Sequence, residues 1–232
     1  MTEGTDGALE NLVNQIAHDV RNHAFTISLQ AEMGLRRAQG SPAVSAHFEA
    51  VLRQVDVLKH YLEQLLLYGR PARLTLTPVD LLALVHEQVE RLQAQWQGDG
   101  SPLAIEVIAE GPLRPGQWDG RALAHALTAL LDNAARSDTP PPPIAVAVQA
   151  EARGVVVEIR DAGPGIPPDV LARVAVPMAV RRPGGAGLGL AITRKIAEAH
   201  GGRLEISSTS SGTTARVTLP WEAGARPGAV DG

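Results

Sequence analysis

Two glycine-rich turns between residues 161 and 190 constrain the fold of this chain more than any other feature. The first reads Asp-Ala-Gly-Pro-Gly over residues 161–165 and follows an apolar run at 155–159, which is typical of a buried strand. The second reads Gly-Ala-Gly-Leu-Gly-Leu over residues 185–190 and leads into a helical pattern at 190–197. The sequence therefore predicts a strand, two close-fitting turns and a helix in this order.

Both turns have the chemistry of a nucleotide site. Glycine adopts positive φ angles and lets the backbone come close to a ligand. The amides of a helix that starts after Gly187 and Gly189 would face an anion. The carboxylate of Asp161, at the end of the strand, can accept a hydrogen bond from an amino group such as that of adenine. Each turn alone is equally consistent with ordinary structural glycines, because short motifs often match by chance.

The composition excludes several classes of protein. The chain has 232 residues, enough for one or two domains, and a formal net charge of -4 without a basic block, which argues against nucleic-acid binding. It has no cysteine, so disulfides and thiolate metal sites are excluded. We expect no membrane span, because no apolar run approaches about 20 residues. Since the N-terminus also lacks a signal-peptide pattern, we expect a cytoplasmic protein.

Residues 1–70 contain two amphipathic helical patterns. Apolar positions recur at intervals of three and four from Leu9 to Ala38. Gly40-Ser41-Pro42 suits the end of one helix and the start of the next. The second pattern is more regular and comprises Val44, Phe48, Val51, Val55, Leu58, Leu62 and Leu65. We predict an antiparallel helical hairpin, which would bury its apolar face by pairing with a second copy in a homodimeric four-helix bundle.

Residues 71–221 change to short strands and helices, an α+β pattern. Strands are expected at 74–77, 103–108, 144–150, 154–160, 203–208 and 214–219, and helices at 79–96, 119–136 and 190–197. Asp119 is expected to cap its helix. The Gly/Ala/Pro-rich residues 222–232 are expected to be a disordered tail.

The end of the helix at 119–136 contains a polar residue in an apolar setting. Asn133 needs hydrogen-bond partners if it is buried. A turn at the helix end could satisfy it. Alternatively, its amide oxygen could bind a hard cation such as Mg²⁺, with Arg136 about one turn on contacting phosphate. Taken alone, the pattern favours the structural explanation.

His18 stands out among the seven histidines because of its neighbours. Asp19 is adjacent, and Asn22 lies one turn on, on the same helix face. A carboxylate beside an imidazole can orient it and accept its proton, which makes the ring nitrogen a nucleophile. Asn22 could position a water against a phosphoryl group. A lone exposed histidine is, however, more often an ordinary surface residue.

Taken together and in order, these motifs resemble those of the transmitter part of two-component sensor histidine kinases. Residues 18–22 resemble the H box, and residues 130–136 resemble the N box. The turns at 161–165 and 185–190 resemble the two glycine boxes. Gly-Thr-Thr at 212–214 resembles the last signature before the closing strand. An ordered set of boxes is far more specific than any one of them.

The resemblance, which covers about residues 8–220, implies a dimeric helical hairpin followed by an ATP-binding α/β sandwich of the GHKL type, shared with gyrase and Hsp90. It implies that His18 is phosphorylated from ATP and passes the phosphoryl group to an aspartate in the receiver domain of a response regulator. Asp19 would act as the base, and Asn22 would orient water in a regulator phosphatase reaction. Mg²⁺ would be held by Asn133. The residues implied for nucleotide binding are Asn133, Arg136, Asp161, Gly163, Gly165, Gly185, Gly187, Leu188, Gly189 and Thr213.

The chain also departs from the family. Ala129 replaces a frequent Asn in the N box, His23 replaces a frequent Pro, and Ala186 replaces a frequent Thr. The segment between the glycine boxes is short, so its lid over ATP should be small. Because only 17 residues precede His18, we expect the signal to come from a separate sensory partner or from segments outside this chain.

Three alternative functions remain open from the sequence. The first is a histidine phosphotransfer or GHKL-type regulatory protein with weak or no autokinase activity. The second is an ATP-driven clamp related to Hsp90 or MutL, in which His18 is incidental. The third is a module that inhibits a sigma factor and phosphorylates a protein serine. Nucleotide binding and the acid stability of any phosphoprotein distinguish these alternatives from an autokinase.

Overall fold

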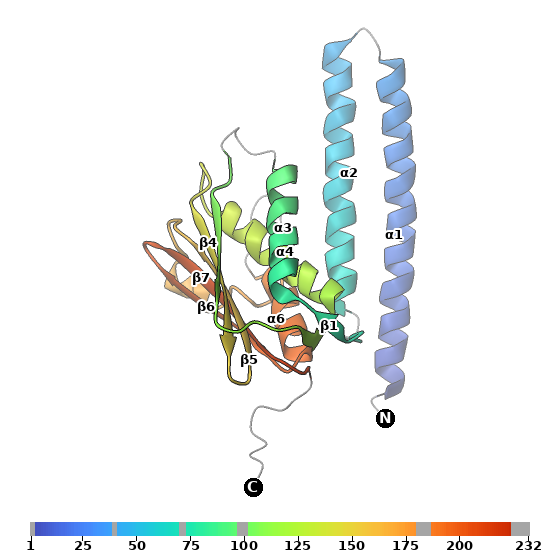
Figure 1. Ribbon diagram of the computed structural model, residues 1–232. Coiled ribbons are helices and arrows are strands. Elements are labelled where there is room, and N and C mark those ends of the chain that lie inside the picture. The colour runs from blue at the N-terminus through green and yellow to red at the C-terminus, as the bar shows by residue number, and fades with distance from the viewer. Residues whose placement is uncertain (1–2, 39–40, 70–72, 97–101, 180–186, 224–232) are drawn as a thin grey trace. The chain divides into compact units, whose positions relative to one another are not determined.

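The chain forms two compact units, one helical and one built around a β-sheet (Figure 1). The computed structural model describes residues 3–38, 41–69, 73–96, 102–179 and 187–223. The domain boundary predicted between residues 70 and 71 lies outside these described residues. Among the described helices, none combines the length and hydropathy that a membrane span requires.

The helical unit is the predicted hairpin. Helix α1 (Glu3–Arg37) and helix α2 (Pro42–Gly69) lie side by side along most of their lengths (Figure 1). Helix α2 begins at Pro42, as expected for proline in the first helical turn. Helix α1 begins six residues before Leu9, the first apolar position of its pattern.

Small side chains of α1 form its contact with α2. Ala24, Ser28 and Ala31 are buried, and a Cβ atom on Gly34 would collide with the ring of Phe48. Further along the hairpin, a small apolar cluster comprises Ala17, Leu62 and Leu66, with Val20 packed against it. Lys59 Nζ donates a 3.1 Å hydrogen bond to the buried Ser28 Oγ. At Gly34 the Phe48 ring occupies the place of a Cβ atom, so the two helices approach closely there because α1 carries no side chain at this position.

The apolar pattern predicted for α2 separates into two rows with heptad spacing. Val55 and Leu62 belong to the row that is buried within the hairpin. The other row is 40–44% exposed and comprises Val44, Val51, Leu58 and Leu65. Large apolar side chains of α1 are also exposed, including Phe25 at 65%. Within this chain, half of the α2 seam therefore lacks the burial that its pattern predicts.

A five-stranded mixed sheet forms the second unit, with strand order β2-β4-β5-β7-β6. Its strands are β2 (Ile105–Glu110), β4 (Ile144–Glu151), β5 (Gly154–Asp161), β6 (Arg203–Thr209) and β7 (Gly212–Pro220). Strand β2 runs parallel to β4, and the other neighbours are antiparallel. A separate pair, β1 (Thr77–Val79) and β3 (Gly116–Trp118), replaces the strand expected at 74–77. The residues at 116–118 carried too short a pattern to predict β3.

Helices cover one face of the sheet (Figure 1). They are α3 (Leu81–Gln95), α4 (Gly120–Ala135) and α6 (Gly189–Ala199), with the short α5 (Pro168–Leu171) before α6. The predicted cap is confirmed, because Asp119 Oδ1 accepts a 2.9 Å hydrogen bond from the Ala122 amide at the start of α4. The predicted combination of a helical hairpin and an α/β domain is therefore confirmed.

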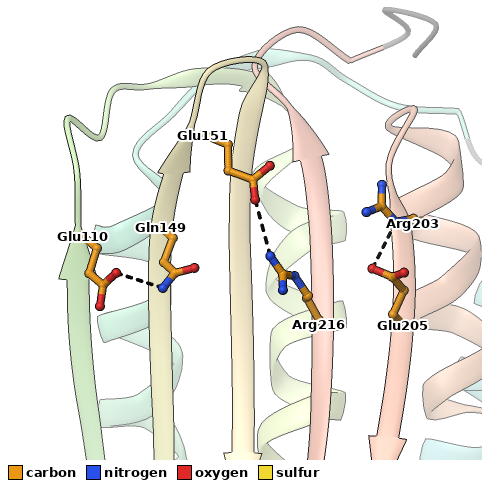
Figure 2. A network of polar contacts seen from close by, with 6 residues as sticks. All are labelled: Glu110, Gln149, Glu151, Arg203, Glu205 and Arg216. Atoms are coloured by element: carbon orange, nitrogen blue, oxygen red, sulfur yellow. Dashed lines mark hydrogen bonds and ion pairs between the residues drawn. The ribbon is translucent and has the colours of Figure 1, made fainter. Parts of the chain in front are cut away.

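Polar pairs line the opposite face of the sheet (Figure 2). Gln149 Nε2 donates a 2.9 Å hydrogen bond to Glu110 Oε2. Arg216 and Glu151 form an ion pair between strands, and Arg203 and Glu205 form a second one along β6. Exposed pairs of this kind contribute about 0–1 kcal/mol each, so their main effect is to keep this face hydrophilic.

Two tryptophans, one at the end of β3 and one just after β7, pack together in the α/β unit. The rings of Trp118 and Trp221 lie 5.9 Å apart between centroids, and Trp118 Nε1 donates to the Pro220 carbonyl at 2.7 Å. The Ala223 amide donates to the Gln117 carbonyl at 3.2 Å. Residues 222 and 223 of the tail predicted at 222–232 therefore pack with the α/β unit, and the rest of that prediction lies outside the described residues.

A buried histidine connects α6 to the start of α4. His200 is fully buried; its Nδ1–H donates to the Ile196 carbonyl at 2.8 Å, and its Nε2 accepts from the Asp119 amide at 3.0 Å. Both bonds are formed by the neutral ring. Burial lowers the pKa of His200 below its ordinary 6.5, although the Ile196 hydrogen bond and the Asp119 charge oppose this shift.

We predict that the α/β unit loses stability as the pH falls below about 6.5, because the unfolded chain then binds a proton that folded His200 resists. The free energy of unfolding should have its full value above that pH and decrease toward the lower folded-state pKa. Urea denaturation between about pH 8 and pH 5 measures this, and the His200→Gln variant should show a weaker pH dependence. The exposed His125→Gln variant is the control; equal pH dependence in all three proteins would contradict the assignment.

Candidate functional site

Asp161 ends β5 and is only 5% exposed. Its Oδ1 accepts a 2.9 Å hydrogen bond from the Gly163 amide. Thr213 on β7 is its neighbour in the sheet register. An ionised carboxylate accepts several hydrogen bonds and donates none. Asp161 is therefore held in a fixed orientation and is suited to receive the N–H of a ligand.

The first glycine turn fits too closely for side chains. A Cβ atom on Gly163 would lie 2.5 Å from Ser137 Oγ and 2.7 Å from Asp161 Oδ1. Gly165 has a φ of 78°, and a Cβ atom there would collide with the carbonyl oxygen of Thr209. The turn is thus confined between the end of α4 and the hairpin of β6 and β7, as glycine alone allows.

Ser208 connects the first glycine turn to the last predicted motif. Its Oγ accepts a 2.8 Å hydrogen bond from the Ile166 amide and lies 2.9 Å from Thr213 Oγ1. Thr213 therefore lies beside the turn that contains Gly163 and Gly165. The sequence did not identify Ser208, because a single serine within a strand pattern carries no motif.

The packing of α6 on α4 brings Gly189, of the second glycine turn, to Asn133. A Cβ atom on Gly189, the first residue of α6, would lie 3.4 Å from Ala129 Cβ and 3.8 Å from Asn133 Nδ2. Gly187, just before it, has a φ of 69°. The small Ala129 lets α6 begin close to α4. The Asn133 amide and the amides of the first turn of α6 therefore lie side by side, an arrangement suited to phosphate.

Arg136 follows α4 as its C-terminal cap. Its Nε lies 2.7 Å from Asp132 Oδ1, and its guanidinium carbon lies 5.3 Å from the centre of the Trp96 ring. The side chain is thus held by an ion pair and a cation–π contact. The expected contact of Arg136 with phosphate remains a prediction.

The remaining predicted residues are less informative. Leu188 is buried, at 1% exposed. Gly185 lies outside the described residues. His18 lies within α1, but its side chain is also outside the described part of the structure. Asp19 and Asn22 are exposed on α1, one turn apart. These last three residues belong to the helical unit, whereas Asn133, Asp161, the turn at 163–165 and Gly189 belong to the α/β unit and contribute the candidate nucleotide site.

The residues fit ATP better than a protein-only metal centre. Among the described side chains, no group of three or more His, Asp or Glu residues could hold a metal ion. A single amide such as that of Asn133 is suited to Mg²⁺ when phosphate and water oxygens supply the other ligands. The buried carboxylate of Asp161 supplies an acceptor for a base, and the start of α6 supplies donors for phosphate.

We predict that Gly165→Ala destabilises the chain by about 2 kcal/mol or more, because the new Cβ would combine a positive φ with a backbone clash. Gly189→Ala is the matched control: its Cβ would make ordinary contacts, so the free energy of unfolding should change by no more than about 1 kcal/mol. Chemical denaturation of both variants measures the difference. Equal stability of the two would contradict the close fit of the first turn.

Part of the chain matches a known protein family. Residues 118–223 match the protein family described as "Histidine kinase-, DNA gyrase B-, and HSP90-like ATPase". The matched range includes Asn133, Asp161 and both glycine turns. The site assembled above therefore lies within the matched domain.

Curated relatives match nearly the whole chain. The nitrogen regulation protein NtrY of Azorhizobium caulinodans is 27% identical over 228 residues, which cover 93% of this chain and 29% of NtrY. The sensor histidine kinase ZraS of Escherichia coli strain K12 is 27% identical over 214 residues, which cover 92% of this chain and 46% of ZraS. The chain thus spans less than half the length of these two relatives.

A solved structure has a similar fold. The crystal structure of full-length ShkA in complex with AMPPNP has a TM-score of 0.77 to this chain at 22% sequence identity. The alignment covers 94% of this chain and 47% of ShkA. At this level of identity the similarity shows the fold alone.

Proposed function

We propose that this chain, which belongs to the sensor histidine kinase family, is an ATP-dependent histidine autokinase that phosphorylates His18 and then an aspartate of a response regulator. One observation carries the proposal. The buried Asp161 carboxylate, the close-fitting Gly163 turn and the Asn133 amide beside the start of α6 all lie around the C-terminal end of α4, within the matched ATPase domain.

Each part of this site has a role toward ATP. Asp161 would accept a hydrogen bond from the amino group of adenine, and the turn at 163–165 would let the backbone approach the base closely. The amides at Gly187 and Gly189, with Leu188 between them, would bind phosphate at the start of α6. Asn133 would hold Mg²⁺, which neutralises charge on the phosphates when bound. Gly185, Thr213 and Arg136 complete the proposed nucleotide-binding residues.

The phosphoryl acceptor is His18 on α1. A ring nitrogen of His18 forms the new bond to the γ-phosphorus, the bond to the bridging oxygen breaks, and ADP leaves. Asp19 would take the imidazole proton. Transfer to the regulator then moves the phosphoryl group from this nitrogen to a carboxylate oxygen of the receiver domain. Positioning and charge neutralisation account for most of such catalysis.

Asn22 is the residue that we propose for a second reaction, the dephosphorylation of the response regulator. Its side chain is exposed on α1 one turn from His18, while its backbone carbonyl accepts a 3.0 Å hydrogen bond from Thr26 Oγ1. An amide in this position could orient water toward the acyl phosphate of the regulator. We therefore include regulator phosphatase activity in the proposal, with Asn22 acting separately from Asp19.

The exposed row of α2 supports a homodimer. Val44, Val51, Leu58 and Leu65 repeat every seven residues and are 40–44% exposed within this chain. A second hairpin would bury them in a four-helix bundle, the arrangement typical of such spacing. The signal would reach the dimer from a separate sensory partner or another segment. Since ATP and response regulators are cytoplasmic, the proposed activity belongs on that side of the membrane.

Replacement of His18 by Gln should abolish stable phosphorylation and leave nucleotide binding intact, because the glycine turns and Asn133 are unchanged. Incubation with γ-labelled ATP measures the label, whose loss in acid and retention in base identify phosphohistidine. Exposed His47→Gln is the control and should be labelled normally. Equal labelling of His18→Gln would overturn the assignment. Label that survives acid would favour the serine-kinase alternative, and binding of ATP without any label would favour a regulatory GHKL protein.

Replacement of Asn133 by Ala should remove the Mg²⁺ dependence of ATP binding, because the amide oxygen is the proposed protein ligand. Titration calorimetry with and without Mg²⁺ measures the change in the dissociation constant. Gln149→Ala is the matched control, since that amide lies on the opposite, polar face of the sheet (Figure 2). An unchanged Mg²⁺ dependence in Asn133→Ala would place the cation elsewhere.

A further inference from the structure

Ser137 is a polar residue of the site that no motif identifies. It follows Arg136, the C-terminal cap of α4, and its backbone amide donates to the Ala134 carbonyl at 3.2 Å. Its side-chain Oγ is buried and has no hydrogen-bond partner among the residues that the structure describes. Native proteins keep few buried hydroxyls in this state, because a desolvated polar atom lowers stability when it is unpaired.

The position of this hydroxyl relates it to Asp161. Ser137 Oγ lies 2.5 Å, and Asp161 Oδ1 lies 2.7 Å, from the point where a Cβ atom of Gly163 would be. The two oxygens therefore both lie against Gly163, where they occupy the place that a Cβ atom would need. Asp161 Oδ1 is hydrogen-bonded to the Gly163 amide, whereas Ser137 Oγ retains its capacity to donate.

We propose that Ser137 is a second residue that selects the base of the nucleotide. Its hydroxyl donates a hydrogen bond to a ring nitrogen of adenine. This nitrogen lies next to the amino group from which Asp161 accepts a hydrogen bond. This inference rests on the proposed ATP binding and deepens it. Ser137 would contact the base directly and take no part in phosphoryl transfer.

The chemistry of the purine edge supports this pairing. In adenine the 6-amino group is a donor and the neighbouring ring nitrogens, N1 and N7, are acceptors. A carboxylate, which only accepts, and a hydroxyl, which can donate, complement such a pair. A 6-oxopurine presents an acceptor toward the carboxylate, so the pair would reject guanine and hypoxanthine. Sites that hydrogen-bond a ligand discriminate strongly, because a wrong ligand leaves their buried polar groups unpaired.

A purely structural explanation makes a different prediction. Ser137 could be needed only as a small residue beside Gly163, in which case alanine would serve equally well. Alanine removes the hydroxyl and keeps the Cβ atom. The Ser137→Ala variant of the full chain therefore separates the two explanations, and the ligand-free variant should melt at the same or a higher temperature than the parent.

The test measures dissociation constants of ATP, 1-deaza-ATP and 7-deaza-ATP for the parent and Ser137→Ala. We expect Ser137→Ala to bind ATP about tenfold more weakly, as for one lost hydrogen bond. One of the two deaza analogues lacks the nitrogen that Ser137 contacts. The parent should bind ATP more tightly than this analogue, whereas Ser137→Ala should bind the two with equal affinity. The other analogue should still be weakened by the substitution. Exposed Ser210→Ala is the matched control and should bind like the parent.

Each other outcome overturns the inference. Unchanged ATP binding by Ser137→Ala, or equal weakening of all three nucleotides, assigns Ser137 a structural role. A ligand-free variant with a lower melting temperature does the same. Failure of the proposed function is distinguishable, because the parent itself would then bind none of the nucleotides.

Discussion

The close approach of α6 to α4 is the contact on which the candidate site depends. At one end, the first residue of α6 is glycine and lies against Ala129 and Asn133. At the other end, His200 just beyond α6 accepts a hydrogen bond from the amide of Asp119, the N-terminal cap of α4. The two helices are therefore antiparallel and held at both ends. Within α6, the fully buried Thr193 donates to the Gly189 carbonyl and supports its first turn.

The same packing explains why the first glycine turn lies where it does. The chain leaves α4 through Arg136 and Ser137 and later returns through β5 to Asp161. Because α4 packs over β5 (Figure 1), the end of the helix and the end of the strand meet beside Gly163. The Ser208 hydroxyl then holds the turn from the opposite side through the Ile166 amide. The turn at 163–165 is thus in contact on both sides, although two of its three residues are glycine.

The helical unit is held together by packing along a repeated apolar pattern, without the glycine turns of the α/β unit. Its internal contact is made by small residues of α1, and half of the apolar seam of α2 is left exposed. The periodicity of the sequence identified both helices and the whole seam. It could not divide the seam into two rows, because the three-and-four spacing is the same for a contact within the hairpin and for one with a second copy.

The sequence by itself determined the order of the long helices and of the five strands of the main sheet, the cap at Asp119 and the positions of the glycine turns. These follow from local chemistry: alternation in strands, glycine at positive φ and a side-chain oxygen at a helix start. Only the tertiary structure decided the pairing of β1 with β3, the pinning of α6 by His200 and the placement of Ser137 and Ser208 at the glycine turn. Each of these joins residues far apart in the chain through a single side chain or a three-residue strand. No local pattern encodes such a contact, because its energy arises only when the sheet and helices have already packed.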